Sequence, residues 1–242
     1  MTQPDVVDLG LDAGRTRPDL EFVYVGDPMC SWCWGFAPVL EQLDRRYAIP
    51  MRTVVGGLRV GSGAGEIDDA MRDTLRHHWE QVEAASGQAF TEASLDRGGW
   101  RYDTEPSCRA VVTLRELDPD GVLAWMRRLH RAFYVEGVDI TDPDVFPDLL
   151  DDADVDVDPD RFRERYHDPA MKDRTWEDFE EARSYGVMGF PTLLLRDGER
   201  FGIVTRGFVP YEDLEPALTA HLEDRYAEHA DGLVCDPETG IC

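Results

Sequence analysis

The sequence predicts an α/β protein that carries a large all-helical insertion. Near the N-terminus, two short apolar runs flank a segment with helical periodicity. A long middle region repeats apolar residues at helical spacing, and near the C-terminus two further apolar runs are joined by Asp-Gly. The predicted order is therefore β-α-β, a helical block, a β-hairpin and a final helix.

The first unit begins with the run Glu21 to Val25, whose β-branched and aromatic residues favour a buried strand before the Gly-Asp-Pro turn. From Cys30 to Tyr47 the apolar residues recur at helical spacing. Met51 to Leu58 is typical of a second strand. Strands joined by a helical crossover are parallel, so this unit should be a right-handed β-α-β.

The middle region shows three helical stripes, formed by Ile67, Met71, Leu75, Trp79 and Val82, by Ala110, Val111, Leu114 and Leu117, and by Val122, Met126, Leu129 and Phe133. The acidic run DLLDDADVDVDPD at 148–160 should be a solvated loop, because it lacks the glycine and the final glutamate of a calcium-binding EF-hand. A later helix, Met171 to Tyr185, should end at Gly186.

The C-terminal part predicts a hairpin of Thr192 to Leu195 and Phe201 to Val204 around a type I′ turn at Asp197-Gly198. A last helix, about Tyr211 to Ala227, follows Pro210. The predicted organisation is a flexible arm (1–19), an α/β core (20–62 with 185–228), a helical insertion (63–184) and a tail with two cysteines (229–242).

The composition is that of a folded protein with an extreme charge. Hydrophobic residues make up 42% of the chain, and 50 acidic residues face 25 basic ones, for a net charge of −25. Only Lys172 is a lysine. Such a field repels phosphate backbones and anionic lipids, so neither nucleic acid nor a membrane surface is an expected partner. The acid excess indicates the cytosol of a salt-accumulating, halophilic organism, where salt screens the charge.

The N-terminus has no basic segment, apolar segment or small-residue cleavage site of a secretory signal, which predicts a cytoplasmic protein. In a reducing compartment, a C-x-x-C pair is more often redox-active or metal-binding than structural. Cys30 stands at the predicted start of a helix, where backbone N–H groups and the helix dipole stabilise a thiolate. Cys33, one turn later, lies within reach to resolve a mixed disulfide.

A second motif points to the same chemistry. DPMCSWCWGF together with GFPTLL, separated by a helical insert, resembles the DsbA family of thiol-disulfide oxidoreductases in the thioredoxin superfamily, in its non-secreted branch. The resemblance implies a thioredoxin-like fold over about residues 20–228, with Cys30 attacking, Cys33 resolving and Pro191 as a cis-proline. It further implies disulfide-containing protein or peptide substrates, and a redox partner that is a thioredoxin-like protein or a small thiol. No cofactor and no metal are expected.

Three aromatic residues around these motifs, Trp32, Trp34 and Phe190, are expected to form an apolar rim for a peptide segment. The chain also departs from the family pattern, because the dipeptide between the cysteines lacks histidine. Tyr24 stands six residues before Cys30, where relatives often place a buried acid. Asp27 is the nearest acid and is predicted to be a local cap of the turn.

Two other functions stay open from the sequence. One is a glutathione-dependent transferase or isomerase on the same fold, similar to kappa-class glutathione transferases and hydroxychromene carboxylate isomerases, which need no second thiol. The other is a zinc module of Cys30, Cys33, Cys235 and Cys242. Cys235 and Cys242 are alternatively an auxiliary, exchangeable redox pair. Cys108 is predicted to be a semi-buried bystander.

Overall fold

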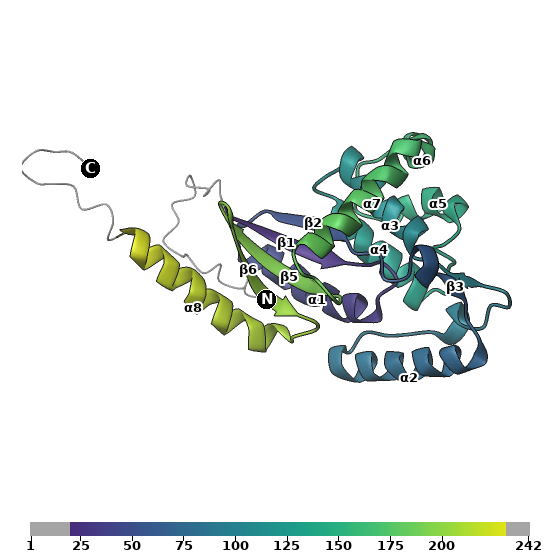
Figure 1. Ribbon diagram of the computed structural model, residues 1–242, viewed down its shortest axis with the longest axis horizontal. Helices are drawn as coiled ribbons and strands as arrows, with labels where there is room; N and C mark the ends of the chain where they lie inside the picture. The colour runs from purple at the N-terminus through teal and green to yellow at the C-terminus, as the bar shows by residue number, and fades with distance from the viewer. Residues whose placement is uncertain (1–19, 231–242) are drawn as a thin grey trace, which may run out of the picture.

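The computed structural model describes residues 20–230, with an open four-stranded sheet at its centre and helices on both faces (Figure 1). The predicted arm and the tail cysteines lie outside the described residues. The strands of this sheet are β1 (Leu20–Gly26), β2 (Met51–Val55), β5 (Thr192–Asp197) and β6 (Arg200–Arg206). Their order is β2-β1-β5-β6, with β1 parallel to β2 and antiparallel to β5. The predicted α/β class with a helical insertion is confirmed.

The helices follow in chain order. They are α1 (Ser31–Arg46), α2 (Asp69–Ser86), α3 (Glu105–Leu117), α4 (Val122–Tyr134), α5 (Phe146–Leu150), α6 (Pro159–His167), α7 (Pro169–Ser184) and α8 (Tyr211–Ala230). The two short strands β3 (Gly65–Glu66) and β4 (Arg101–Tyr102) pair with each other beside the helices. Helices α2 to α7 all lie between β2 and β5 in the chain, as the three helical stripes predict.

Alternate residues of β1 face opposite sides of the sheet, as the period of two in a strand requires. Phe22 and Tyr24 belong to the large core shared with α1 and α8, and the ring of Phe22 packs edge-on against Tyr47 at the end of α1. Val23 and Val25 form a smaller cluster on the other face with Ala182 of α7. The sheet is therefore buried on both faces at the end of β1, just before the loop that leads to Cys30.

The edge of the sheet at β2 is closed by side chains of the insertion. The backbone N–H of Val55 donates to Asp178 of α7 at 2.9 Å, and Arg115 of α3 donates to the carbonyl of Thr53 at 2.6 Å. Arg115 and Asp178 also form an ion pair at 2.7 Å. Two polar groups of this edge thus have partners from the helical insertion.

Two local predictions are wrong in detail. The second strand ends at Val55 rather than Leu58, because Gly56 and Gly57 follow and Gly57 has a φ of 69°. The hairpin loop consists of Gly198 and Glu199, with Asp197 paired to Arg200. Gly198 has a positive φ of 61° while Asp197 stays in the strand, so the turn is shifted by one residue from the expected type I′ turn at Asp197-Gly198.

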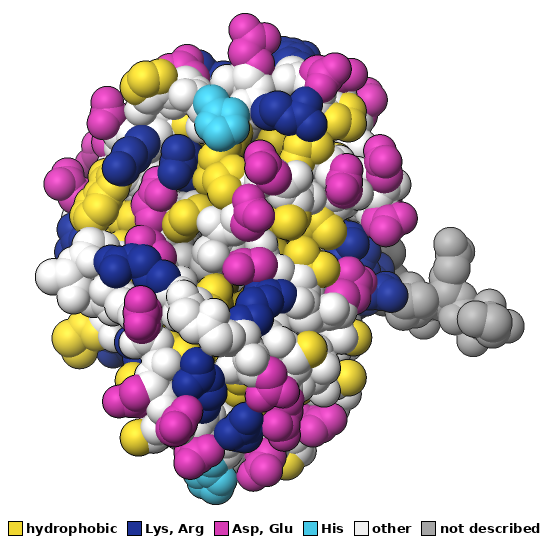
Figure 2. All heavy atoms as spheres, turned by 90° about the vertical axis from the view of Figure 1, so that its right-hand side faces the viewer, with side chains coloured by type: hydrophobic (Ala, Val, Ile, Leu, Met, Phe, Trp, Pro, Cys, Tyr) yellow, Lys and Arg dark blue, Asp and Glu magenta, His cyan; other side chains and the backbone are white. Residues whose placement is uncertain are grey.

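The surface mixes charges on the helical side of the molecule. Figure 2 shows acidic and arginine side chains interspersed over this face. Within residues 20–230, no helix is both long enough and apolar enough to cross a bilayer.

Candidate active site

The site is built where β1 ends and α1 begins. Cys30 is the N-cap residue of α1, with extended backbone angles, and the N–H groups of Cys33 and Trp34 donate to its carbonyl oxygen at 3.0 and 3.1 Å. Cys30 is 6% exposed and Cys33 is 0% exposed. Both are free thiols. Of the two residues, Cys30 therefore keeps a small exposed fraction, whereas Cys33 has none.

The segment before β5 meets Cys30 across 160 residues of sequence. The Phe190–Pro191 peptide bond is cis, and the thiol of Cys30 donates to the carbonyl oxygen of Phe190 at 3.6 Å. The carbonyl of Pro191 accepts from the N–H of Gly207 at 2.7 Å, which ties this segment to the end of β6. The fold thus brings the two sequence motifs together at one sulfur atom.

Phe190 is seated against the backbone at the end of β2. A Cβ atom built on Gly56 would lie 2.0 Å from Cε1 of Phe190, far inside van der Waals contact. Only glycine at this position leaves room for the ring. The close approach fixes the position of the Phe190 ring, beside the carbonyl that Cys30 contacts.

Replacing Gly56 with alanine is therefore expected to displace Phe190. Overpacking of this kind costs about 1–3 kcal/mol in unfolding free energy, and Cys30 should react more slowly with a disulfide because its contact with Phe190 changes. Urea unfolding and the rate of reaction with a small aromatic disulfide measure the two effects. Gly63→Ala is the matched control, since a Cβ there meets no atom within 4 Å. Equal behaviour of the two variants would contradict the packing argument.

The three aromatic residues of the expected rim are not equivalent. Trp32 is half-buried, with its ring 5.6 Å from Phe208 and edge-on to His78 at 5.8 Å. Phe190 is also half-buried. Trp34 is only 7% exposed, and its indole N–H donates to the carbonyl of Ala89 at 3.1 Å. Trp34 belongs to the core that joins α1 to the segment after α2, so its expected place on the rim is wrong.

Two exposed apolar residues beside the site were missed by the sequence analysis. Met188, two residues before Phe190, is 99% exposed, and Leu58, just after β2, is 41% exposed. The position of Met188 next to Phe190-Pro191 is a signal that could have revealed it. Leu58 had no such signal, because its place near Cys30 depends on a long-range contact with Asp27.

The contact with Leu58 is made by Asp27, whose buried carboxylate lies next to the loop that leads to Cys30. Its Oδ1 accepts from the N–H of Met29 at 2.8 Å, and its Oδ2 accepts from the N–H of Leu58 at 2.7 Å and from the hydroxyl of Thr104 at 2.8 Å. The thiol of Cys108 also donates to Oδ2, at 3.4 Å. Burial raises the pKa of Asp27, and these four donors oppose the shift. Asp27 is thus more than the local cap that we predicted, because it joins the loop to β2 and α3.

Cys108 is not semi-buried. It is 0% exposed, and burial raises the pKa of its thiol well above the usual value, with the carboxylate of Asp27 acting in the same direction. It therefore stays a neutral thiol that donates to Asp27. Sequence spacing could not show this, because the two residues are 81 positions apart.

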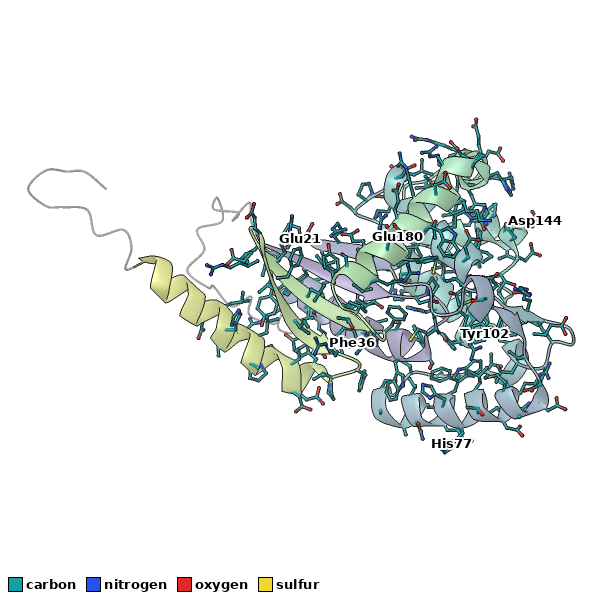
Figure 3. All side chains as sticks on the ribbon, viewed as in Figure 1. Glu21, Phe36, His77, Tyr102, Asp144 and Glu180 are labelled. Carbon is teal, nitrogen blue, oxygen red and sulfur yellow. The ribbon has the colours of Figure 1, made fainter. Side chains whose placement is uncertain are left out.

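Two further residues of the insertion hold the same loop. Tyr102, which is buried and is labelled in Figure 3, donates its hydroxyl to the carbonyl of Met29 at 2.7 Å. His130 of α4 is buried, with Nε2 3.3 Å from the carbonyl oxygen of Asp27. Burial lowers the pKa of His130 to about 4, so the ring is neutral near pH 7. Since a carbonyl oxygen only accepts, Nε2 carries the proton.

Cys33 lies in the core, in the first turn of α1 after Cys30. Burial raises its pKa well above the usual value, and the neighbouring sulfur of Cys30 raises it further, whereas the hydroxyl of Tyr24 lowers it. Within the part of the chain that the structure describes, no three His, Cys, Asp or Glu side chains are grouped to hold a metal ion. The proposed partners Cys235 and Cys242 lie outside this part.

Several known proteins resemble this chain in sequence and fold. A candidate protein disulfide isomerase from Nitrosomonas europaea is 32% identical, with a TM-score of 0.77, and the match covers 85% of this chain and 98% of that one. The cytosolic disulfide reductase DsbM from Pseudomonas aeruginosa, solved with GSH, is 25% identical, with a TM-score of 0.65, over 84% of this chain and 98% of that one.

A curated relative and a family model complete the comparison. The ClpXP adapter protein SpxH from Halalkalibacterium halodurans is 24% identical over 208 residues, which is 81% of this chain, and the chain spans 66% of that protein's length. The model of the DSBA-like thioredoxin domain matches residues 22–219, a range that includes Cys30, Cys33 and Pro191. The chain therefore belongs to the family of DSBA-like thioredoxin domains.

Proposed function

We propose that this protein is a thiol-disulfide oxidoreductase that acts on disulfide-containing proteins or peptides through Cys30 and Cys33. The observation that carries the proposal is the asymmetry of the pair. Cys30 is at the start of α1, partly accessible and 3.6 Å from the Phe190 carbonyl, whereas Cys33 is fully buried one turn further on. One sulfur is placed to meet a substrate and the other to meet only the first sulfur.

The exchange has two balanced steps. The thiolate of Cys30 attacks a substrate disulfide, which forms a mixed disulfide and releases one substrate thiolate. The sulfur of Cys33 then attacks Cys30, which forms the Cys30–Cys33 disulfide and releases the second substrate thiol. A dithiol partner or a small thiol returns two electrons to the pair. In the oxidising direction the same steps run in reverse.

The apolar side chains around Cys30 support a peptide substrate. The carbonyl of Phe190 contacts the thiol of Cys30, and Trp32 follows Cys30 by two residues. Met188, two residues before Phe190, and Leu58, whose N–H donates to Asp27, add exposed apolar side chains, and Pro191 lacks an N–H group of its own. An extended peptide can lie along this segment, with its side chains against the apolar residues. We further propose that the protein works in the cytoplasm, consistent with the acidic composition.

Replacing Cys33 with alanine tests the proposal directly. Without the resolving sulfur, the mixed disulfide on Cys30 should persist, and intact mass after blocking free thiols should show a disulfide-bearing model peptide attached at Cys30. Cys108→Ser is the control, because a serine hydroxyl can still donate to Asp27 and the variant should keep normal turnover. A Cys33→Ala protein that retains no peptide would contradict the proposal. Activity with glutathione and an electrophile that survives Cys33→Ala would instead favour the transferase or isomerase function.

A further inference from the structure

Tyr24 of β1 buries a hydroxyl group that has no hydrogen-bond partner of ordinary geometry among the described residues. Tyr24 is 0% exposed. Most of the other buried tyrosine hydroxyls are paired, as in Tyr102 with Met29 and Tyr47 with Thr219. A buried polar atom without a partner is unfavourable, so its presence calls for an explanation.

The position of this hydroxyl is set by a glycine two residues further along the strand. A Cβ atom on Gly26 would lie 2.4 Å from the hydroxyl oxygen of Tyr24. The phenol therefore occupies the space that a side chain at Gly26 would need, and it extends along β1 toward its C-terminal end. There the hydroxyl lies next to the thiol of Cys33.

The carboxylate of Asp27, three residues before Cys30, already has hydrogen-bond partners of its own. The two carboxylate oxygens of Asp27 accept from Met29, Leu58, Thr104 and Cys108. Asp27 faces Cys33 only with its backbone N–H group. Tyr24 is thus the side-chain hydroxyl that lies beside the buried sulfur and has no other partner.

We propose that Tyr24 is a catalytic hydrogen-bond donor that stabilises the thiolate of Cys33 each time this sulfur attacks or leaves Cys30. The inference rests on the proposed exchange function and deepens it by adding a third active-site residue. When a substrate is reduced, the S–S bond of the mixed disulfide breaks, the Cys30–Cys33 bond forms, and the proton of Cys33 passes to the departing substrate thiolate. In the reverse direction Cys33 leaves as a thiolate that accepts the hydrogen bond of Tyr24.

The environment of Tyr24 restricts it to donation. Burial raises the pKa of its phenol well above the usual value, and the two neighbouring sulfurs raise it further. The hydroxyl is therefore protonated near neutral pH, so it does not take the proton of Cys33. It stabilises negative charge on that sulfur without becoming charged itself.

Tyr24→Phe tests this role with a disulfide that reports both steps, 5,5′-dithiobis(2-nitrobenzoate). The attack of Cys30 releases one coloured thionitrobenzoate in a bimolecular phase, and the attack of Cys33 releases a second in a unimolecular phase. We expect the first phase to stay within about two-fold of wild type and the second to slow about 10-fold to 100-fold, as for the loss of a hydrogen bond to a charged acceptor.

Tyr134→Phe is the matched control. Tyr134 is also fully buried with an unpartnered hydroxyl in the same core, and the two cysteines act on it only through the longer-range field of their charge. Both phases of this variant should match wild type. Urea unfolding should show Tyr24→Phe to be at least as stable as wild type, because the change removes an unpaired buried hydroxyl.

The outcomes separate this inference from the function on which it rests. A second phase within two-fold of wild type in Tyr24→Phe would overturn the role of Tyr24 and leave the exchange function intact. Equal slowing of both phases together with lower stability would show a structural role instead, and would also overturn it. A wild-type protein that releases no second equivalent would contradict the exchange function itself.

Discussion

Asp27→Ala is expected to lower the free energy of unfolding by about 3 kcal/mol, because it leaves two backbone N–H groups, the buried one of Met29 and the partly buried one of Leu58, without an acceptor. Each orphaned donor costs about 1–3 kcal/mol, and relief from burying a charge offsets part of the sum. The hydroxyl of Thr104 and the thiol of Cys108 lose their acceptor as well. Urea denaturation at neutral pH measures the change.

The same variant should also impair the site, because Asp27 holds the loop that carries Cys30 to the start of α1. The rate of alkylation of Cys30 reports this effect. Asp68→Ala is the matched control, since the side chain of Asp68 accepts from the N–H of Met71 at the exposed start of α2. Loss of an ordinary helix cap costs about 1 kcal/mol. Equal losses for the two variants would reduce Asp27 to a local cap.

His130 should make the protein less stable in mild acid. Its pKa in the folded protein is about 4, below the usual value of 6.5. The unfolded chain therefore binds a proton at His130 between these values while the folded protein does not, so stability falls as the pH drops through this window. From pH 7 to pH 4.5 the loss from His130 alone should be about 2 kcal/mol.

His130→Gln isolates this contribution. Glutamine can still donate a hydrogen bond to the carbonyl of Asp27, but it does not titrate. The stability difference between wild type and variant should therefore change by about 2 kcal/mol between the two pH values. Asp27 acts in the opposite direction, because a raised carboxyl pKa adds stability as the pH falls, and it contributes equally to both proteins. A difference that does not vary with pH would contradict the buried, neutral histidine.

The elements of the fold could be predicted from the sequence where local chemistry decides them. The strand before Gly26, the helix after Cys30 and the end of a helix at Gly186, which has a φ of 69°, all follow from periodicity and backbone preference. The end of β2 was misplaced because the apolar run continues to Leu58. There, the backbone of Leu58 turns toward Asp27 instead of continuing the ladder.

Only the site residues that belong to sequence motifs could be predicted from the sequence. Cys30, Cys33 and Pro191 stand in recognisable sequence contexts, whereas Tyr102, Thr104 and His130 do not. These last three residues meet the Asp27–Cys30 loop from 73, 77 and 103 positions away, through packing of the insertion. Trp34 was expected on the rim for the same reason. Its indole N–H donates to the carbonyl of Ala89, which lies beyond α2 in the sequence. No local pattern encodes such distant partners.

Because Arg115 and Asp178 bind the free edge of β2, the helical insertion also protects this edge strand from pairing with another chain. An edge strand with free N–H and C=O groups is a template on which another chain can add a strand. A shortened protein without α3 and α7 would keep both cysteines and Pro191, yet it would leave the N–H of Val55 and the carbonyl of Thr53 open. Such a shortened protein is expected to pair with further strands along this open edge and to aggregate.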